Sequence, residues 1–333
     1  MTDPSRPRVA VLALGGTIAM TSAASGGVVP TLTGDMLVAA VPALRTLAEV
    51  EAVSFRQLPG AHLGFDDLEA LAGEIRRRWR AGQQGFVVTQ GTDTIEETAF
   101  TLDRLLDIDA PVIVTGAMRN PTVPGADGPA NLLAAVQVVV GAEATGLGTL
   151  VVMNDEIHAA RFVRKTHTSS PAAFTSPLAG RIGWLAEGRV RIPLRPPAVP
   201  VVPGEPRQQA RVAILTVGLG DDGSLVRSAQ AAGFDGLVVE ATGGGHVAPA
   251  TAQALEAAAR DMPVVLASRT GAGEILANTY GFEGGEIDLL RRGLVRAGWL
   301  DAIKARVLLM LLLRRGIRER PAVEEAFRPW GGA

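Results

Sequence analysis

The sequence predicts an α/β protein built on doubly wound parallel sheets. Short aliphatic segments alternate along the chain with segments of helical character. The aliphatic segments are continuously apolar, as expected for strands of a parallel sheet that helices cover on both faces. Such alternation of strands and helices is typical of doubly wound folds. The predicted strands are 8–14, 85–89, 111–115, 149–153, 211–217, 236–240 and 263–267, and the predicted helices are 36–50, 66–80, 95–106, 130–140, 225–232 and 250–260.

A proline-rich segment, residues 192–206, interrupts this alternation. Its prolines disfavour both a helix and a central strand, so it predicts an extended connection between two domains. We therefore expect an N-terminal domain at 1–190, a linker at 191–207 and a C-terminal domain at 208–333. A chain of 333 residues has ample material for the cores of both domains.

The composition argues against several classes of function. A net charge of −2 provides no attraction for nucleic acid or for an anionic membrane. The chain has no cysteine, which excludes disulfides, thiolate metal sites and a cysteine nucleophile. Its polar N-terminus does not resemble a signal peptide, and its longest aliphatic run, 307–313, is far shorter than a membrane helix. We expect a soluble, cytoplasmic protein.

Two turns that carry threonine follow predicted strands. They read Leu-Gly-Gly-Thr-Ile at 14–18 and Thr-Gln-Gly-Thr-Asp-Thr at 89–94. Open α/β proteins keep their active sites at the carboxyl ends of the strands, and glycine there lets a ligand approach the backbone. In a chain without cysteine, the hydroxyl groups of Thr17 and Thr92 are therefore the candidate nucleophiles.

Each turn also has a purely structural interpretation. The first is then only a tight turn whose hydroxyl caps a helix. In the second, Thr94 and Glu97 have the spacing of a capping box, which would orient the turn without excluding a function. The segment 21–30, rich in Ser, Ala and Gly, follows Thr17 and is either a lid or a plain surface connection.

Basic residues gather after the strand that ends at Met153. Arg161, Arg164 and Lys165 lie within five positions of one another. If Lys165 points into the cleft, the neighbouring positive charges and partial burial favour its neutral amine, which suits proton transfer. The alternative is a solvated basic loop.

A glycine-rich segment in the second half suggests a different function. The sequence Gly-Leu-Gly-Asp-Asp-Gly at 218–223 follows a predicted strand and precedes a helix, and Glu240 ends the next strand, as in a dinucleotide-binding turn. Asp221 and Asp222 argue against it, because their carboxylates would repel a pyrophosphate at the helix N-terminus. We expect no metal, because the four histidines lack ligand spacing and no HExxH motif is present.

The two threonine-bearing turns closely resemble the paired signatures of the bacterial-type L-asparaginase family. The similarity continues through Thr-Gly-Ala-Met-Arg at 115–119, Ala-Asp-Gly-Pro-Ala-Asn-Leu at 126–132, Val-Met-Asn-Asp at 152–155 and Lys-Ala-Arg-Val-Leu-Leu at 304–309. It covers essentially the whole chain. The resemblance implies a larger N-terminal domain with a flavodoxin-like parallel sheet and a smaller C-terminal domain with a Rossmann-like parallel sheet.

The resemblance also implies an activity that needs no cofactor. Asparagine would be hydrolysed to aspartate and ammonia through an acyl-threonine intermediate, with Thr17 in the position of the family's nucleophile. Thr92, Asp93 and Lys165 match a triad that shares proton transfer and substrate orientation, and Gly91 and Asp93 lie in the turn that binds the substrate. A threonine hydroxyl attacks only when a base removes its proton. Which threonine attacks first, and which group deprotonates it, stays open.

The assembly implied by the resemblance is a homodimer or a homotetramer, with no nucleic acid or membrane partner. In the family the active sites form at a dimer interface, where the neighbouring subunit contributes an asparagine and a glutamate. Glu286 matches the glutamate, and His246 stands in the place of the asparagine.

The chain departs from the family pattern around the expected substrate. Gly60 and Ala61, followed by His62, stand where the family usually has Ser and then Gln or Glu, and the only tyrosine, Tyr280, lies far from the family's lid position. Losing hydrogen-bonding groups that face an α-amino acid weakens selection for free asparagine. The sequence therefore leaves open glutamine or another carboxamide as the substrate, and also a non-catalytic subunit that binds an amino acid.

Overall fold

The chain folds as two compact units, residues 1–201 and 202–333. The structure is a computed structural model that describes residues 6–16, 18, 20–22, 28–30 and 33–332. The division between the units lies inside the proline-rich segment 192–206. Residues 192–211 are all described and contain no helix or strand.

Unit 1 is built around an eight-stranded sheet. Its strands are β1 (Arg8–Ala13), β4 (Glu49–Ser54), β5 (Gly85–Thr89), β6 (Val112–Thr115), β7 (Thr149–Met153), β8 (Glu156–Ala159), β11 (Gly183–Ala186) and β12 (Arg189–Arg191). They lie in the order β12-β11-β8-β7-β6-β5-β1-β4. From β4 to β7 the strands are parallel and follow the flavodoxin-like order second, first, third, fourth, fifth. The prediction of a doubly wound α/β sheet is confirmed, although β8, β11 and β12 join it antiparallel.

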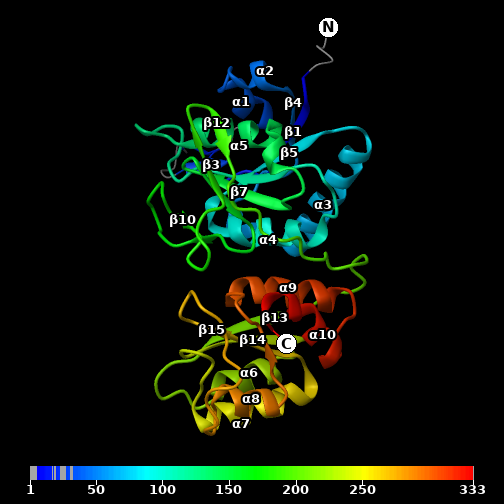
Figure 1. Ribbon diagram of the computed structural model, residues 1–333, viewed down its shortest axis with the longest axis vertical. Helices are drawn as coiled ribbons and strands as arrows, with labels where there is room; N and C mark the ends of the chain where they lie inside the picture. Colours follow the sequence, from blue (N-terminus) through cyan, green and yellow to red (C-terminus); the bar gives the residue numbers. More distant parts are fainter. Residues whose placement is uncertain (1–5, 17, 19, 23–27, 31–32, 333) are drawn as a thin grey trace. The chain divides into compact units, whose positions relative to one another are not determined.

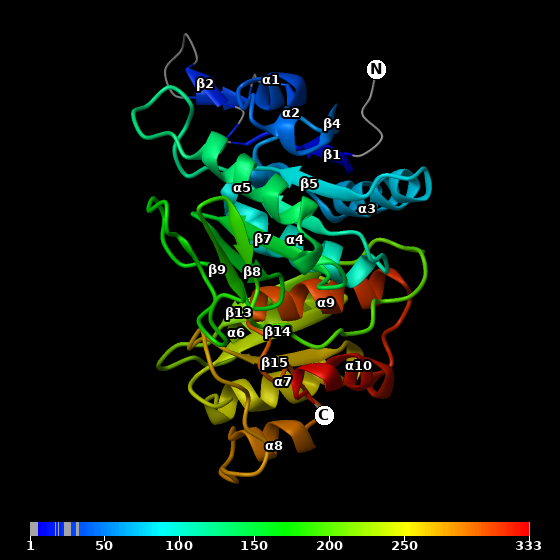
Figure 2. The same ribbon diagram turned by 45° about the horizontal axis from the view of Figure 1, so that its top comes forward.

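Helices cover both faces of this sheet (Figures 1 and 2). On one face lie α1 (Gly34–Ala39), α2 (Leu44–Leu47) and α5 (Gly128–Val140), and on the other lies α4 (Ile95–Leu105) with α3 (Phe65–Arg80) beside it. Side chains of β1, β5 and β6 form a buried core with the first group of helices, including Val11, Val87, Ile113, Leu132 and Val136. The remaining short elements of unit 1 are β2 (Met20–Ser22), β3 (Val28–Pro30), β9 (Arg164–Lys165), β10 (Phe174–Thr175), η2 (Gly60–His62), η3 (Thr92–Thr94) and η4 (Ala142–Ala144).

The predicted helix at 36–50 is wrong. The segment instead contains two short helices, α1 and α2, and the first residues of the edge strand β4. Pro42 lies between α1 and α2, and proline lacks the N–H group that a helix interior needs and restricts the residue before it. Glu49 and Glu51 are exposed on β4, so this strand lacks the continuous apolar pattern of the central strands.

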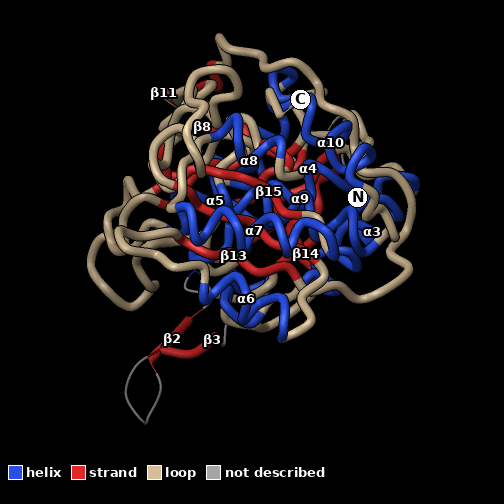
Figure 3. The backbone as a smooth tube through the Cα atoms, turned by 90° about the horizontal axis from the view of Figure 1, so that it is seen from below, coloured by secondary structure: helices blue, strands red, loops and turns tan. Residues whose placement is uncertain are grey.

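The segment predicted as a lid or a surface connection, 21–30, contains part of a small antiparallel ribbon. Strands β2 and β3 pair with each other and project from the rest of unit 1 (Figure 3). Residues 23–27 lie outside the described residues, so the lid stays a prediction.

Unit 2 contains a parallel sheet in the order β13-β14-β15-β16. Its strands are β13 (Val212–Thr216), β14 (Gly236–Ala241), β15 (Val264–Ser268) and β16 (Val295–Arg296), and its helices are α6 (Ser224–Ala231), α7 (Pro249–Asp261), α8 (Glu286–Arg291), α9 (Ala302–Arg314), α10 (Arg320–Phe327) and η5 (Arg328–Trp330). Helix α9 covers one face of the sheet and α6 and α7 cover the other (Figure 1). The predicted Rossmann-like parallel sheet is confirmed. The long aliphatic run at 307–313 is the buried stretch of α9.

Candidate active site

The two threonine-bearing turns meet at the carboxyl edge of the unit 1 sheet. Strands β1 and β5 are parallel neighbours, with Ala13 paired to Thr89. Gly16 lies directly against Gly91, because a Cβ atom on Gly16 would come within 1.9 Å of the Gly91 backbone nitrogen. Gly16 also has a φ of +84°, which glycine adopts without steric cost. The residue that follows it, Thr17, lies outside the described residues, so its role as nucleophile stays a prediction.

The structure places Thr92, Asp93 and Lys165 together. Lys165 Nζ donates hydrogen bonds to Thr92 Oγ1 at 2.9 Å and to Asp93 Oδ1 at 2.7 Å. The side chain of Lys165 is 14% exposed, whereas that of Asp93 is 69% exposed. Thr92 is buried at the start of η3. Lys165 therefore lies against the second turn and does not belong to a solvated basic loop.

Glu96 holds the backbone of Lys165, and the sequence analysis did not single it out. This buried carboxylate lies in the first turn of α4, directly after η3. Its Oε2 accepts the backbone N–H of Lys165 at 3.1 Å. The signal in the sequence is an acidic residue shortly after the threonine-bearing turn, but only the fold shows that it faces β9.

A hydrogen-bond network supports the wall beside Thr92. Asn131 Nδ2 donates to the Gly116 carbonyl at 3.0 Å, and Asp127 Oδ2 accepts the Met118 N–H at 3.0 Å. A Cβ atom on Gly116 would lie 3.3 Å from Thr92 Cγ2. The motifs at 115–119 and 126–132 therefore shape the loop that packs on Thr92.

Gly60, Ala61 and His62 form η2 beside the second turn. A Cβ atom on Gly60 would lie 2.9 Å from the Gly91 carbonyl oxygen, so the two glycines are in close backbone contact. Ala61 and His62 are exposed. Gly60 and Ala61 bring no side-chain hydrogen-bonding group to this part of the site.

The capping box predicted for Thr94 and Glu97 is wrong. Thr94 is the N-cap of α4, but its side chain makes no capping hydrogen bond in the described part of the chain. Its Oγ1 donates to the Gly60 carbonyl at 3.0 Å and accepts from Gln90 Nε2 at 3.3 Å. The Thr94 hydroxyl thus bonds the carbonyl of a neighbouring loop and does not cap its own helix. This hydrogen bond links η2 to the second turn.

Unit 2 brings His246 and Glu286 into contact. His246 Nε2 lies 3.1 Å from Glu286 Oε2, and Glu286 Oε1 accepts the N–H groups of Thr279 and Tyr280 at 2.8 and 2.7 Å. Burial raises the pKa of Glu286, but these hydrogen bonds outweigh it and hold the pKa below its ordinary value of 4.5. The exposed rings of Tyr280 and Phe282 meet the imidazole edge-on. Of the two residues expected at a subunit interface, His246 therefore lies beside an exposed aromatic pair, whereas Glu286 is buried behind it.

A second polar cluster lies where β10 ends. His158 is buried on β8, with Nδ1 2.9 Å from Ser176 Oγ and Nε2 3.4 Å from Glu156 Oε2. Burial lowers the pKa of His158 from 6.5 to about 4, and Glu156 opposes this shift only in part. The imidazole is therefore neutral at pH 7, and it anchors the chain directly after the strand that pairs with Lys165.

The glycine-rich turn at 218–223 is not arranged for a pyrophosphate. Asp222 Oδ1 accepts the N–H of Ser224, the first residue of α6, at 2.9 Å. Asp221 Oδ1 accepts the Gly223 N–H at 2.9 Å and the Thr251 hydroxyl at 2.8 Å. These carboxylates occupy the positions that an anion needs at a helix N-terminus.

The unit 1 site can move a proton and bind a cation. Thr92 and Lys165 share a hydrogen bond, so a proton can pass between the hydroxyl and the amine. The exposed carboxylate of Asp93 faces solvent and can hold a substrate ammonium group beside the lysine. Hydroxyl, amine and carboxylate together suit the attack of a hydroxyl group on a carbonyl carbon.

Comparisons with known proteins agree with this chemistry. Residues 8–198 match the asparaginase N-terminal domain family, and residues 211–327 match the glutaminase/asparaginase C-terminal domain family. A probable L-asparaginase of Deinococcus radiodurans is 39% identical over 322 residues, which covers 94% of either chain. A probable periplasmic L-asparaginase of Haemophilus influenzae is 34% identical over 92% of this chain and 88% of the relative. The crystal structure of a probable cytoplasmic L-asparaginase from Campylobacter jejuni matches with a TM-score of 0.87 and 32% identity, covering 97% of this chain and 99% of that one.

Proposed function

Because the chain belongs to the asparaginase family, we propose that it is an amidohydrolase that converts L-asparagine to L-aspartate and ammonia. The observation that carries this proposal is the contact of Lys165 with both Thr92 and Asp93, directly beside the meeting point of Gly16 and Gly91. This arrangement supplies a proton relay and a carboxylate at the end of two adjacent strands.

The proposed reaction proceeds through an acyl-threonine ester. The hydroxyl oxygen of Thr17 attacks the carboxamide carbon, its proton passes to a base, and the C–N bond breaks as the nitrogen takes up a proton and leaves as ammonia. Water then attacks the ester carbon, releases aspartate and returns the proton to the threonine. Thr92 and Lys165 form the relay for these protons. Attack by Thr92 is the alternative that remains open.

Substrate binding is proposed for Asp93, which would pair with the α-amino group, and for the backbone of Gly91. The loop Gly60, Ala61 and His62 faces the same turn, and the tight contact between Gly60 and Gly91 leaves no room for a serine side chain without movement. This observation favours a second candidate substrate, glutamine or a carboxamide without a free α-carboxylate.

We propose that the active protein is a homodimer or a homotetramer, in which His246 and Glu286 complete the site of a second copy. The support is the contact of His246 with the exposed rings of Tyr280 and Phe282, and the 3.1 Å contact of His246 with the buried Glu286. Mixing an inactive Lys165→Met variant with an inactive Glu286→Gln variant should restore activity, because some sites then receive both native residues. If the mixture stays inactive while native mass spectrometry with one variant carrying a mass tag shows mixed oligomers, shared sites are excluded.

A cytoplasmic location is proposed, in line with the Campylobacter jejuni neighbour, which is named as a probable cytoplasmic L-asparaginase. Among the described residues, no helix combines the length and the apolar character needed to cross a membrane. The Haemophilus influenzae relative is named as periplasmic, so cell fractionation is the deciding test.

The experiment that tests the function is ammonia release from L-asparagine, L-glutamine and an asparagine with a blocked carboxylate, with Thr17→Ala as the control. Turnover of asparagine that disappears in Thr17→Ala supports the proposal. Turnover of only the other amides keeps the mechanism and changes the substrate. Thermal stabilisation by asparagine without any turnover would instead indicate a subunit that only binds amino acids.

A further inference from the structure

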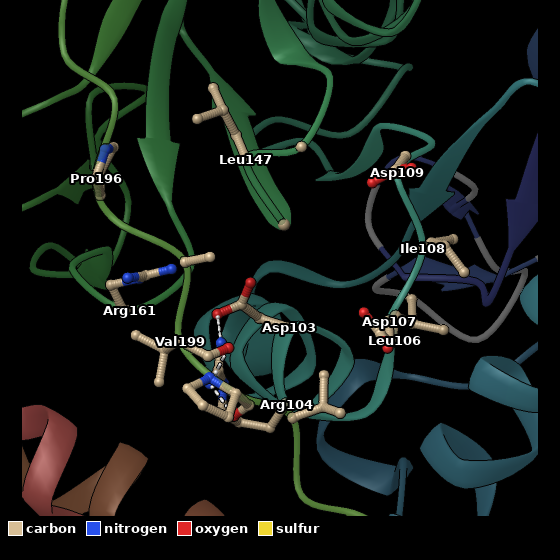
Figure 4. A pocket seen from close by; sticks show the side chains of 15 residues that line it. Asp103, Arg104, Leu106, Asp107, Ile108, Asp109, Leu147, Arg161, Pro196 and Val199 are labelled. Atoms are coloured by element: carbon tan, nitrogen blue, oxygen red, sulfur yellow. Dashed lines mark hydrogen bonds and ion pairs between the residues drawn. The ribbon is translucent and has the colours of Figure 1, made fainter.

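A pocket of about 480 Å³ opens at the amino-terminal edge of the unit 1 sheet (Figure 4). Its walls are the end of α4 with the loop that follows (103–109), the turn before β7 (146–148), Arg161 and residues 196–201 of the proline-rich segment. Strand β8 runs antiparallel to β7 with Ala159 opposite Leu150, so Arg161 lies beyond the amino end of β7. The volume falls within the range of about 300–1,000 Å³ that is typical of small-molecule sites.

This pocket is separate from the candidate active site. Glu96, which holds Lys165, lies in the first turn of α4, whereas Asp103 lies at its end. The rise of 1.5 Å per residue puts about 10 Å between these two positions along the helix axis. A ligand in the pocket is therefore not a ligand of the proposed asparaginase reaction.

One buried ion pair in the wall is already complete. Arg104 is 2% exposed, and its Nη2 lies 2.6 Å from Asp103 Oδ2. Asp103 Oδ1 accepts the backbone N–H of Thr149 at 3.0 Å. Arg104 also donates to the carbonyl groups of Val199 and Pro200. Asp103 thus pairs directly with Arg104, and it attracts Arg161 only at longer range.

Among the residues that the structure describes, Arg161 has no such ion pair. It is 7% exposed, and its Nη1 donates to the Pro197 carbonyl at 2.6 Å. Its Nε is buried without a hydrogen-bond partner among the described residues. A guanidinium group stays protonated in proteins, and a buried charge is costly unless a counter-charge and hydrogen bonds meet it. The buried wall therefore carries one positive charge that fits a single carboxylate.

The other side of the pocket is acidic. Asp107 and Asp109 are exposed residues of the loop after α4, and Figure 4 shows them across the pocket from Arg161. Two carboxylates near the opening repel a dianion such as sulfate and attract a cationic group. The pocket presents a cation on one wall and anions on the other.

We propose that this pocket binds a small zwitterion, with its carboxylate at Arg161 and its ammonium group facing Asp107 and Asp109. No asparaginase chemistry is involved, so this site goes beyond the proposed function. The volume of the pocket allows the carboxylate and the ammonium group of the ligand to be separated by several carbon atoms. The proposed ligands are therefore free amino acids, including those with a terminal amine.

Isothermal titration calorimetry of the full chain tests the proposal with glycine, γ-aminobutyrate and ε-aminocaproate, and with acetate and sulfate as probes of a single charge type. At least one zwitterion should bind more tightly than acetate or sulfate. Arg161→Gln should raise its Kd about tenfold or more, because hydrogen bonds to a charged group are lost. Turnover is not measured, so failure of the asparaginase proposal leaves this test intact.

Arg195→Gln is the matched control. Arg195 donates to the carbonyl groups of Glu143 and Thr145 at 2.6 and 2.8 Å. It therefore anchors the same proline-rich segment without lining the pocket. Zwitterion binding should survive this change. If Arg195→Gln weakens binding as much as Arg161→Gln does, Arg161 acts only by holding the segment, and the proposal is overturned.

A second variant keeps the test decisive if Arg161→Gln does not fold. Replacing both Asp107 and Asp109 by asparagine changes only exposed side chains. It should weaken binding of the zwitterion and strengthen binding of acetate and sulfate. If the two aspartates had only a structural role, their loss would not change the two affinities in opposite directions. Absence of zwitterion binding to the native protein, or a native preference for sulfate, rejects the proposal.

Discussion

Replacing Lys165 by methionine should separate the chemistry of the candidate site from the stability of the fold. Methionine matches the lysine side chain as far as Cε but lacks Nζ, and so removes its hydrogen bonds to Thr92 Oγ1 at 2.9 Å and to Asp93 Oδ1 at 2.7 Å. General acid–base catalysis contributes about 10²–10⁴ in rate. We therefore expect kcat/KM for L-asparagine to fall about 10³-fold, which corresponds to about 4 kcal/mol of transition-state stabilisation.

The free energy of unfolding should change little in the same variant. The Asp93 side chain is 69% exposed, so its carboxylate remains hydrated after the lysine is removed. An ion pair of this kind stabilises a fold by about 0–1 kcal/mol. The Lys165→Met protein should thus lose activity while its free energy of unfolding stays close to that of the native protein.

Lys304→Met is the matched control with the opposite expectation. Lys304 Nζ lies 2.7 Å from Asp301 Oδ2, and the lysine side chain is 0% exposed. Removing one partner of a buried pair costs about 3–5 kcal/mol. We expect a clear loss of stability, while the folded fraction keeps native kcat/KM because the pair of Lys304 with Asp301 lies at the start of α9 and includes no residue proposed for the site.

The assay couples ammonia release to NADH oxidation, and urea unfolding followed by tryptophan fluorescence reports stability. Unfolding midpoints are compared, because a chain of two units need not unfold in a single step. The reasoning is refuted if kcat/KM of Lys165→Met stays within about tenfold of the native value, because the loss of an acid–base group should lower it by about 10²-fold or more. It is also refuted if Lys165→Met and Lys304→Met lose equal stability.

Three further changes test the glycine contact and the two buried titratable groups. Gly16→Ala should abolish activity, because the new Cβ would lie 1.9 Å from the Gly91 nitrogen. Gly82→Ala, at a similar φ of +90° but with only a side-chain atom at 3.5 Å, should cost about 1–2 kcal/mol and keep activity; equal activity losses would contradict the contact. Because the pKa of His158 is lowered from 6.5 to about 4, the unfolded chain binds the proton first, and the free energy of unfolding should fall by about 3 kcal/mol as the pH drops across this window. Urea titrations should show a flatter pH dependence for His158→Gln, and an unchanged slope would disprove the assignment. The pKa of Glu286 lies below 4.5, so its contribution to the free energy of unfolding is present above pH 4.5 and is lost as the pH falls further. Urea unfolding curves below pH 4.5 should therefore show a smaller decrease of this free energy for Glu286→Gln than for the native protein.

The architecture could be predicted where a local pattern coincides with a buried element. Strands β5 and β7 are apolar except for one terminal threonine each and are buried at every position, so their pattern shows in the sequence before any partner is known. The edge strand β4 escaped prediction because its exposed glutamates break that pattern. Strand β8 pairs antiparallel with β7 through a two-residue turn, Asn154 and Asp155, whose φ angles of 53° and 58° are typical of a hairpin. This local signal was missed in the sequence analysis.

The candidate site shows the same division between local and long-range information. The functional groups of the second turn could be named from the sequence, since Gly91, Thr92 and Asp93 are adjacent in the chain. Tertiary structure alone decided that Lys165, more than seventy positions away, contacts two of them.

The partners of Glu96, Thr94 and Arg161 were likewise decided only by the fold. Glu96 accepts a hydrogen bond from strand β9, and Thr94 donates to Gly60 in preference to its own helix. Arg161 became a buried charge beside a pocket because α4, β8 and the proline-rich segment converge there. Turn chemistry and strand hydrophobicity depend on neighbours in the chain and can be seen in the sequence, whereas burial and hydrogen-bond partners depend on which distant segments pack together.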